Sequence, residues 1–360
     1  MEHIVVGDIP DIDSYGMDVA RFLEAEFLPV KVVKYKAGEI KPILLFKGQP
    51  ERWASKLEPY DIDGKDMIVA FRDNRVYPDA DKYLRKNYLI VNAIRNVERN
   101  FDIEVDVIDA IMPYLYYARQ DRAALGEPCS LEEIAKELES KTIERLFTYN
   151  SHIYGREDRN LGQYFSEISG MLGHSTIPHD IPLAELFAEK LIDFGVESPA
   201  IINPDGDSIS RLLDIFDEFD VRYVNPFFRY VLQKRQPDGS KKFLESYLNG
   251  IEGETAIIVD DLSDSGGTLI RAIDEVSNHN PKEIFVVVTH IFDEEPIRRL
   301  IEKKKTNPLF KTIITSDSLY LDTTQEKEAL VADYRKNFHE IDTTKFIADY
   351  IKEDDLDSLG

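Results

Sequence analysis

The stretch AIIVDDLSDSGGTLIRA, residues 256–272, places four apolar residues before two aspartates and a Ser-Gly-Gly-Thr turn. A short apolar run of this kind is typical of a central parallel strand, and the residues after it lie at the carboxyl end of that strand. Open α/β sheets bind their ligands at this end. The stretch therefore predicts a parallel α/β sheet with a binding site directly after residue 259.

The turn at residues 264–268 has the composition of an anion-binding loop. Gly266 and Gly267 allow positive φ, so consecutive N–H groups can point to one place at the start of the next helix. Ser265 and Thr268 add hydroxyl groups, and the two leading carboxylates can accept hydrogen bonds from sugar hydroxyls. A ribose 5-phosphate suits both parts of this pattern. The alternative interpretation is that the aspartates cap a turn that the glycines merely permit.

Apolar segments of strand length alternate with amphipathic helical patterns along the chain, which is the signature of βαβ units. The prediction is an α/β protein of two Rossmann-like domains with mainly parallel sheets, residues 1–170 and 171–321. The C-terminal segment, residues 322–360, is a candidate to pack on the first domain. A helix over 130–140 should begin with a capping box at Ser130.

The charge of the chain limits its partners. Its 68 acidic residues exceed its 44 basic residues, which gives a net charge of −24. A field of this sign repels nucleic acid and anionic membrane surfaces. No apolar run reaches the 18 residues of a membrane-spanning helix, and residues 1–16 lack the pattern of a secretory signal. The single cysteine, Cys129, cannot form an internal disulfide. These features predict a cytoplasmic protein without nucleic-acid or membrane partners.

Several segments together resemble one family. VDDLSDSGGT, residues 259–268, resembles the ribose-phosphate signature of the type I phosphoribosyltransferase fold, which includes the ribose-phosphate pyrophosphokinases, or PRPP synthetases. MPYLYYARQDR, residues 112–122, is similar to the segment with which those synthetases bind ATP, and ordinary phosphoribosyltransferases lack it. Further matches to the synthetase pattern are KYKAGEI (34–40), YNSH (149–152), NPDGD (203–207) and VLQKRQP (231–237). The resemblance extends in order over residues 1–322.

The resemblance implies a reaction and a set of site residues. The family transfers the β,γ-diphosphoryl group of ATP to the C1 hydroxyl of ribose 5-phosphate with Mg²⁺, which gives PRPP and AMP. By this resemblance the ribose phosphate would be held by Asp260, Asp261, Asp264, Ser265, Gly266, Gly267 and Thr268. ATP would be bound by Tyr35, Glu39, Arg119, Gln120 and Arg122. His152 and Asp205 would bind the metal, and the catalytic cations would be Lys234 and Arg235.

The chain also departs from the family pattern. Asn150 stands where the family has an aspartate, Gln236 stands where many members have a second arginine, and the segment after Asp205 lacks the usual glycine and alanine run. Two alternatives therefore stay open: the acceptor is ADP-ribose, or the chain is a non-catalytic partner that regulates an active synthetase. A phosphoribosyltransferase that consumes PRPP is disfavoured by the segment at 112–122. Because the family shares its nucleotide site between subunits, a homo-oligomer of at least two subunits is expected.

Overall fold

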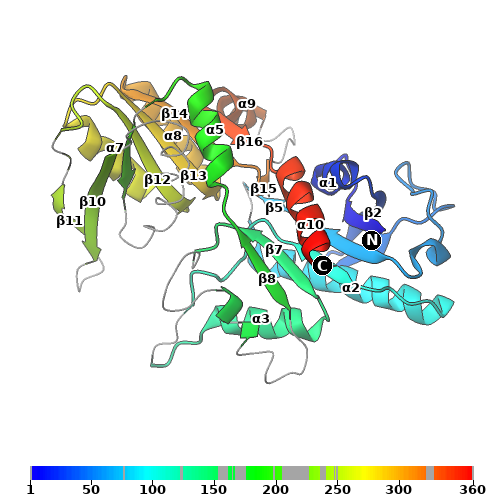
Figure 1. Cartoon of the computed structure of the whole chain (residues 1–360). Coiled ribbons are helices and arrows are strands. Elements are labelled where there is room, and N and C mark those ends of the chain that lie inside the picture. Colours follow the sequence, from blue (N-terminus) through cyan, green and yellow to red (C-terminus); the bar gives the residue numbers. More distant parts are fainter. Residues whose placement is uncertain are drawn as a thin grey trace.

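The computed structural model describes residues 2–75, 78–121, 125–152, 161–163, 165–166, 176–197, 199–204, 248, 250–321 and 328–358, and the backbone of 227–235 and 241–246. These residues form two lobes, each built on a seven-stranded sheet (Figure 1). The predicted fold class, α/β with mainly parallel sheets, is confirmed.

The first sheet has the strand order β3-β2-β1-β4-β6-β7-β8. Its strands are β1 (His3–Asp8), β2 (Glu26–Lys34), β3 (Ile40–Leu44), β4 (Asp66–Ala70), β6 (Ile108–Ile111), β7 (Arg145–Tyr149) and β8 (Ile177–Ile181). All neighbours are parallel except β2 and β3, which form an antiparallel hairpin. The helices of this lobe with described bounds are α1 (Tyr15–Leu23), α2 (Ala80–Phe101), α3 (Ser130–Ser140) and the 3-10 helix η1 (Pro59–Ile62).

Local signals explain how these helices begin. The side chain of Asp79 accepts a hydrogen bond of 3.0 Å from the backbone N–H of Lys82 and so caps α2. The helix predicted over 130–140 is present as α3, but its N-cap is Cys129 rather than Ser130. The predicted capping box is wrong because Ser130 Oγ instead donates to the side-chain oxygen of Gln120.

The second sheet has the order β11-β10-β9-β12-β13-β14-β16. Its strands are β9 (Ala200–Asn203), β10 (Phe227–Arg235), β11 (Lys241–Ser246), β12 (Thr255–Ser263), β13 (Glu283–Ile291), β14 (Phe310–Ser316) and β16 (Phe338–Ile341). Only β10 and β11 are antiparallel. The helices of this lobe are α5 (Ala184–Asp193), α7 (Gly267–Ser277), α8 (Glu294–Thr306) and α9 (Glu328–Asn337).

In each sheet, the order in which the chain adds strands reverses at one pair of neighbouring strands. In the first sheet the chain leaves β1 toward β2 on one side and leaves β4 toward β6 on the other. In the second sheet it leaves β9 toward β10 and leaves β12 toward β13. Such switch points open a crevice at the carboxyl ends of the two strands, where α/β sheets bind ligands. The fold therefore provides two places of this kind, at β1/β4 and at β9/β12.

The boundary between the lobes differs from the prediction. The first sheet extends to Ile181 rather than ending at residue 170, because β8 pairs with β7 along its whole length. Near the C-terminus, β16 joins the second sheet, and α10 (Thr344–Ser358) then returns to pack against α1 of the first lobe (Figure 1). One apolar cluster contains Ile68 of β4, Ile257 of β12 and Ile347 of α10, so the lobes share a continuous core.

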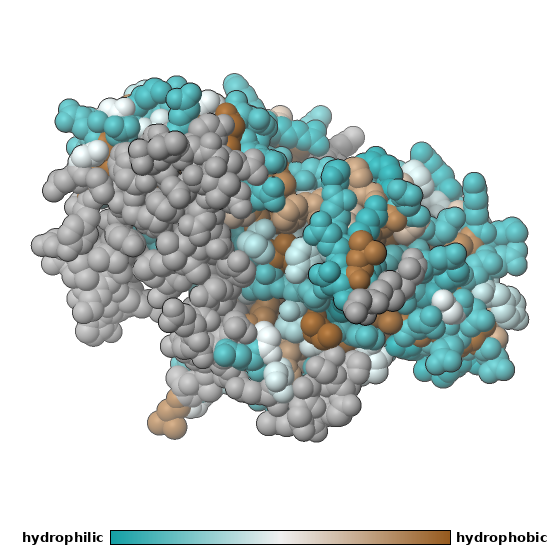
Figure 2. Space-filling view, in the orientation of Figure 1, coloured by the Kyte–Doolittle hydropathy of each residue, from teal (hydrophilic) through white to brown (hydrophobic). Residues whose placement is uncertain are grey.

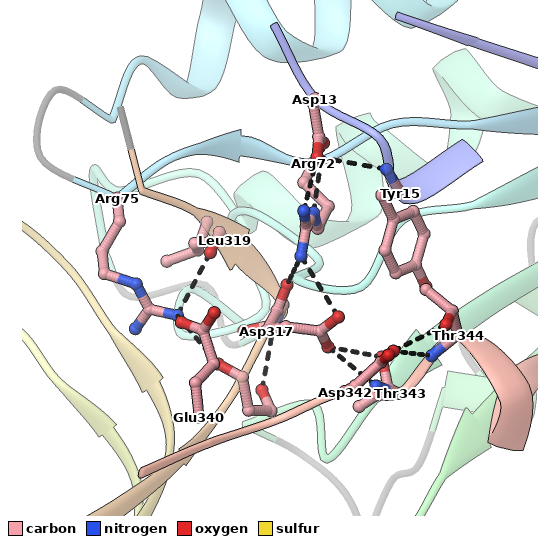
Figure 3. A network of polar contacts seen from close by, with 12 residues as sticks. Asp13, Tyr15, Arg72, Arg75, Asp317, Leu319, Glu340, Asp342, Thr343 and Thr344 are labelled. Carbon is pink, nitrogen blue, oxygen red and sulfur yellow. Dashed lines mark hydrogen bonds and ion pairs between the residues drawn. The ribbon is translucent and has the colours of Figure 1, made fainter. Parts of the chain in front are cut away.

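Buried arginines also join the lobes. Arg75 is fully buried and donates to the carbonyl oxygens of Ser316 (2.8 Å) and Leu319 (3.1 Å) and to the carboxylate of Glu340 (2.9 Å). Arg72 lies between Asp13 of the first lobe and Asp317 of the second (Figure 3). Beside these contacts, β5 (Asp73–Asn74) and β15 (Leu319–Tyr320) pair across the boundary. Removing either arginine would leave several buried acceptors without a donor.

In the view of Figure 2 the described surface is mostly hydrophilic, and apolar residues are scattered over it. Within these residues, no helix combines the length and apolar character that crossing a bilayer requires.

Candidate functional site

The loop between β12 and α7 has the geometry of an anion-binding turn. Gly266, the N-cap of α7, has a φ of +72°, which favours glycine. A Cβ at this position would lie 3.3 Å from Cα of Pro296, so the turn has little room for a side chain. The N–H of Gly267 donates to Oγ of Ser265 at 3.4 Å, and the dipole at the start of α7 favours an anion. The predicted order of strand, turn and helix is confirmed here.

The two carboxylates before the loop are buried within β12, which continues to Ser263 rather than ending at residue 259 as predicted, because it stays paired with β13. Asp260 accepts a hydrogen bond of 3.0 Å from the backbone N–H of Asp261. Oδ2 of Asp261 lies 2.7 Å from Nδ1 of His152, which follows β7 of the other lobe. Two predicted site residues that are 109 positions apart in the chain are therefore in direct contact.

The turn after β7 positions His152. Asn150 has a φ of +37°, and its side chain donates to Oγ1 of Thr289 on β13 (2.9 Å) and accepts from the N–H of Leu183 (3.3 Å). The N–H of Ser151 donates to Asp180 at 2.9 Å. These bonds fix the backbone on both sides of the turn. As a result, the imidazole of His152 is held toward Asp261.

Arg119 approaches the loop at residues 264–268 from the first lobe. It lies in the segment after β6, and its guanidinium contacts the carboxylate of Asp264 at 3.0 Å. Both side chains are about half exposed or more, with exposed fractions of 49% and 65%. Gln120 turns toward α3 instead, where its backbone oxygen accepts from the N–H of Leu131 at 3.2 Å. In this structure Gln120 therefore supports the loop, and Arg119 is the residue that meets the second lobe.

A tyrosine forms the wall behind these residues. Tyr114 is buried and packs edge-on against Phe292 and His290, with ring centroids 4.4 and 4.7 Å apart. Burial raises the pKa of Tyr114, Arg119 opposes this rise, and Asp261 and Asp264 add to it. Its hydroxyl group is therefore a neutral donor. Sequence reasoning missed this residue because a tyrosine in an aromatic-rich segment carries no local signal of a site.

Arg299 was also missed. It lies on α8, 34 residues after the loop, and its guanidinium donates to the carbonyl oxygen of Ser265 at 2.7 Å. This bond holds the loop from outside and adds positive charge next to it. No spacing within the loop sequence predicts a partner so far along the chain.

Other predicted site residues lie elsewhere. Tyr35 and Glu39 occupy the exposed turn between β2 and β3, and the strands β1, β4 and β6 separate this hairpin from β7. Lys234 and Arg235, predicted in a loop, lie at the end of β10, opposite residues 242 and 241 of β11. They are in a strand because β10 continues past its pairing with β9 into an antiparallel hairpin. Arg122 and Asp205 lie outside the described residues.

The donor set fits a magnesium ion bound partly by substrate. Mg²⁺ prefers oxygen ligands and usually keeps waters and substrate phosphates beside one or two carboxylates. Asp260 and Asp261 are such carboxylates, and His152 presents Nδ1 to Asp261, which leaves Nε2 as its nitrogen for a metal. Across the ranges that the structure describes, no group of three or more His, Cys, Asp or Glu residues is arranged to hold a metal. The described residues by themselves therefore supply an incomplete ligand set.

Comparisons with known proteins give a consistent result. A profile described as "Phosphoribosyl transferase domain" matches residues 180–318. The ribose-phosphate pyrophosphokinase of Fusobacterium nucleatum is 25% identical over 277 residues, which cover 72% of this chain and 79% of the relative. The enzyme of the same name from Halalkalibacterium halodurans is 25% identical over 280 residues, covering 75% and 79%. The crystal structure of phosphoribosylpyrophosphate synthetase from Mycobacterium smegmatis superposes with a TM-score of 0.71 at 16% identity and covers 98% of each chain.

The second lobe thus has the type I phosphoribosyltransferase fold, and the loop at residues 264–268 joins β12 to α7 within the matched domain. Over about three quarters of its length the chain is also similar to ribose-phosphate pyrophosphokinases, and its fold matches that of a phosphoribosylpyrophosphate synthetase.

Proposed function

We propose that this enzyme transfers the diphosphoryl group of ATP to the C1 hydroxyl of ribose 5-phosphate and thereby makes PRPP and AMP. In this step the C1 oxygen attacks the β-phosphorus, and the bond from that phosphorus to the oxygen bridging it to the α-phosphorus breaks. AMP leaves with the bridging oxygen, and the hydroxyl proton passes to solvent. The names of the relatives support this reaction.

One observation carries the proposal. The segment of the first lobe that resembles an ATP-binding segment meets the phosphate loop of the second lobe through Arg119 and Asp264, and His152 meets Asp261 beside it. A transfer between two substrates requires both to be bound side by side, in line for attack. A site that held PRPP alone would not need Arg119 or His152 from the first lobe.

Each residue then has a physical role. The N–H groups at 264–268 would bind the 5-phosphate, and Asp260 and Asp261 would accept hydrogen bonds from the ribose hydroxyls. Arg119 would exchange Asp264 for the phosphates of ATP, because a guanidinium makes two parallel bonds to a phosphate. Breaking the ion pair between Arg119 and Asp264 costs little free energy, since an exposed ion pair contributes about 1 kcal/mol or less.

We also propose that Mg²⁺ is the cofactor, held by His152, by a nearby carboxylate and by substrate oxygens. When bound, the ion neutralises charge on the phosphoryl groups. Lys234, Arg235, Arg122 and Asp205 remain the proposed partners in catalysis and binding, as the resemblance implies.

The direct experiment follows AMP release from ATP with ribose 5-phosphate in one reaction and ADP-ribose in a parallel one, with and without Mg²⁺. We expect AMP only with an acceptor and Mg²⁺, and faster release with ribose 5-phosphate. Arg119→Ala should lower kcat/KM by at least tenfold. The matched control is Arg298→Ala, because Arg298 is an exposed arginine paired with Glu294 on α8. Faster AMP release with ADP-ribose would identify ADP-ribose as the acceptor. No AMP release with either acceptor would overturn the proposal.

The exposed hairpin supports a further part of the proposal, a homo-oligomer. Tyr35 is 49% exposed at an edge of the sheet, and a Cβ added at Gly38 in the same turn would meet no described atom within 4 Å. We propose that this turn reaches the nucleotide site of a second copy. Tyr35→Ala should also lower the activity. Mixing Tyr35→Ala subunits with Arg119→Ala subunits should give more activity than either variant alone, because mixed dimers contain one intact site. Absence of any recovery in mixtures that do assemble would exclude a shared site.

A further inference from the structure

A large cavity lies away from the phosphate loop, at the switch point of the first sheet. It has a volume of about 630 Å³ and is lined by residues 10–14 after β1 and by Arg72 after β4. Its other wall comes from the second lobe and includes Lys190 of α5, Arg335 of α9 and His339 of β16. The same topological rule that locates the phosphate site at β9/β12 thus locates this cavity at β1/β4.

The acidic residues of this cavity already have partners. Asp13 pairs with Arg72, as Figure 3 shows, and Asp11 accepts a hydrogen bond of 2.8 Å from the indole of Trp53. Glu340 pairs with the buried Arg75 and accepts from the hydroxyl of Tyr334 at 2.8 Å. The charges of Asp13 and Glu340 are therefore compensated by arginines, whereas the exposed Asp11 has a neutral partner.

The basic residues are much less compensated. Lys190 has one acidic partner, Asp193, at 3.6 Å, and that side chain is 70% exposed. Within the described part of the chain, Arg335 forms no ion pair. Burial lowers the pKa of His339, and the charges of Lys190 and Lys304 lower it further. Lys190 and Arg335 therefore place positive charge on this wall, although the chain carries a net charge of −24.

Interaction with a helix dipole explains only part of this cluster of charged residues. Arg335 lies in the last turn of α9, where cations interact favourably with the helix dipole. Lys190 belongs to another helix, and Arg72 and Asp13 belong to the other lobe. Dipole compensation at α9 does not explain why these residues surround a cavity with room for a small molecule.

We propose that this cavity is a second anion site, which binds a phosphate monoester of a small hydroxylated molecule. The phosphate lies between Lys190 and Arg335, and the remainder of the molecule extends toward the loop at residues 10–14. An arginine and a lysine together provide a fork and a point charge for one phosphate group. Because such a ligand contacts both lobes, its binding stabilises their association.

The test uses the full chain and glycerol 3-phosphate as the probe in isothermal titration calorimetry. The wild type should bind two equivalents, one at the loop of residues 264–268 and one in the cavity. Lys190→Gln combined with Arg335→Gln should bind one equivalent or bind the second at least tenfold more weakly. Gly266→Val should lose the other equivalent. Failure of the loop site is thus distinguishable from failure of the cavity site.

The control replaces two lysines of the same lobe outside the cavity, Lys305→Gln with Lys311→Gln, and should leave both equivalents unchanged. Circular dichroism melting would show that each variant is folded. The proposal is overturned if the cavity variant keeps both equivalents, if the wild type binds only the equivalent that Gly266→Val removes, or if the control loses the second equivalent equally. Citrate in place of the probe tests phosphate against carboxylate: equal affinity would contradict the assignment of a phosphate ligand.

Discussion

The side-chain amide of Asn150, at the end of β7 in the first lobe, donates a hydrogen bond of 2.9 Å to Oγ1 of Thr289, on β13 of the second. Both residues are buried, and Asn150 also accepts from the N–H of Leu183. The family's aspartate at this position is thus replaced by a residue that donates and accepts at once. The bond ties the backbone of the His152 turn to the second lobe.

A first prediction concerns this bond. Asn150→Ala should lower the free energy of unfolding by about 1–3 kcal/mol, because it leaves a buried N–H and a buried hydroxyl without a partner. Asn150→Gly should lose the same bonds without strain at positive φ, and Asn150→Asp should lose less, because the Thr289 hydroxyl can donate to a carboxylate. Urea unfolding measures all three. The exposed Asn100→Ala is the control, and a change at Asn150→Ala within about 0.5 kcal/mol of wild type would contradict the argument.

A second prediction separates backbone strain from ligand binding at the phosphate loop. Gly266 and Gly253 have φ values of +72° and +76°, but only Gly266 faces another residue closely, with Pro296 Cα at 3.3 Å. Alanine at either position should cost about 1–2 kcal/mol of stability from the left-handed conformation. Only Gly266→Ala should weaken ribose 5-phosphate binding, by tenfold or more, as measured by calorimetry. Equal affinities in the two variants would rule out the loop as the phosphate site.

A third prediction concerns Asp317 and pH. Burial raises the pKa of Asp317 from its ordinary 3.8 to about 7, against the lowering effects of Arg72 and of the Thr343 hydroxyl. Between about pH 4 and pH 7 the folded state then binds more protons than the unfolded state. The contribution of this residue to stability therefore falls as the pH rises through that window, by at most about 1.4 kcal/mol per pH unit, and becomes constant above it.

Asp317→Asn removes this titration and keeps an acceptor for Thr343. The difference in unfolding free energy, wild type minus variant, should therefore decrease from pH 5 to pH 7 and level off by pH 8. Chemical denaturation at each pH measures it. A difference that stays constant or increases with pH would show that Asp317 remains ionised in the folded protein.

A fourth prediction concerns the union of the two lobes. Arg75→Met should destabilise the protein by about 3–5 kcal/mol, because it removes the donor for two carbonyl oxygens and the partner of Glu340. Calorimetry should then resolve two unfolding transitions where the wild type has one. Arg21→Met is the control, since Arg21 is 64% exposed and pairs with Asp18 on the surface. A single transition with unchanged midpoint in Arg75→Met would show that the apolar core alone joins the lobes.

Local features of this protein could be predicted from the sequence because their cause is local. Four apolar residues, two aspartates and the Ser-Gly-Gly-Thr turn determine a buried strand, a turn with positive φ and a helix start, all within residues 256–272. The alternation of such units indicates two parallel α/β domains for the same reason. The predicted helix over 130–140 also formed, but its cap did not, since Ser130 found a partner ten positions earlier in Gln120.

Contacts between distant segments depended on the tertiary structure. His152 and Asp261 are 109 positions apart, and Arg119 and Asp264 are 145 apart, so no spacing rule connects either pair. Arg75 is buried because the carboxyl ends of the first sheet face the second lobe. The same packing forms the cavity beside Arg72. The sequence determined which backbone turns could bind an anion. Packing of the two sheets decided which charges surround each turn, because electrostatic interactions depend on distance in space and not along the chain.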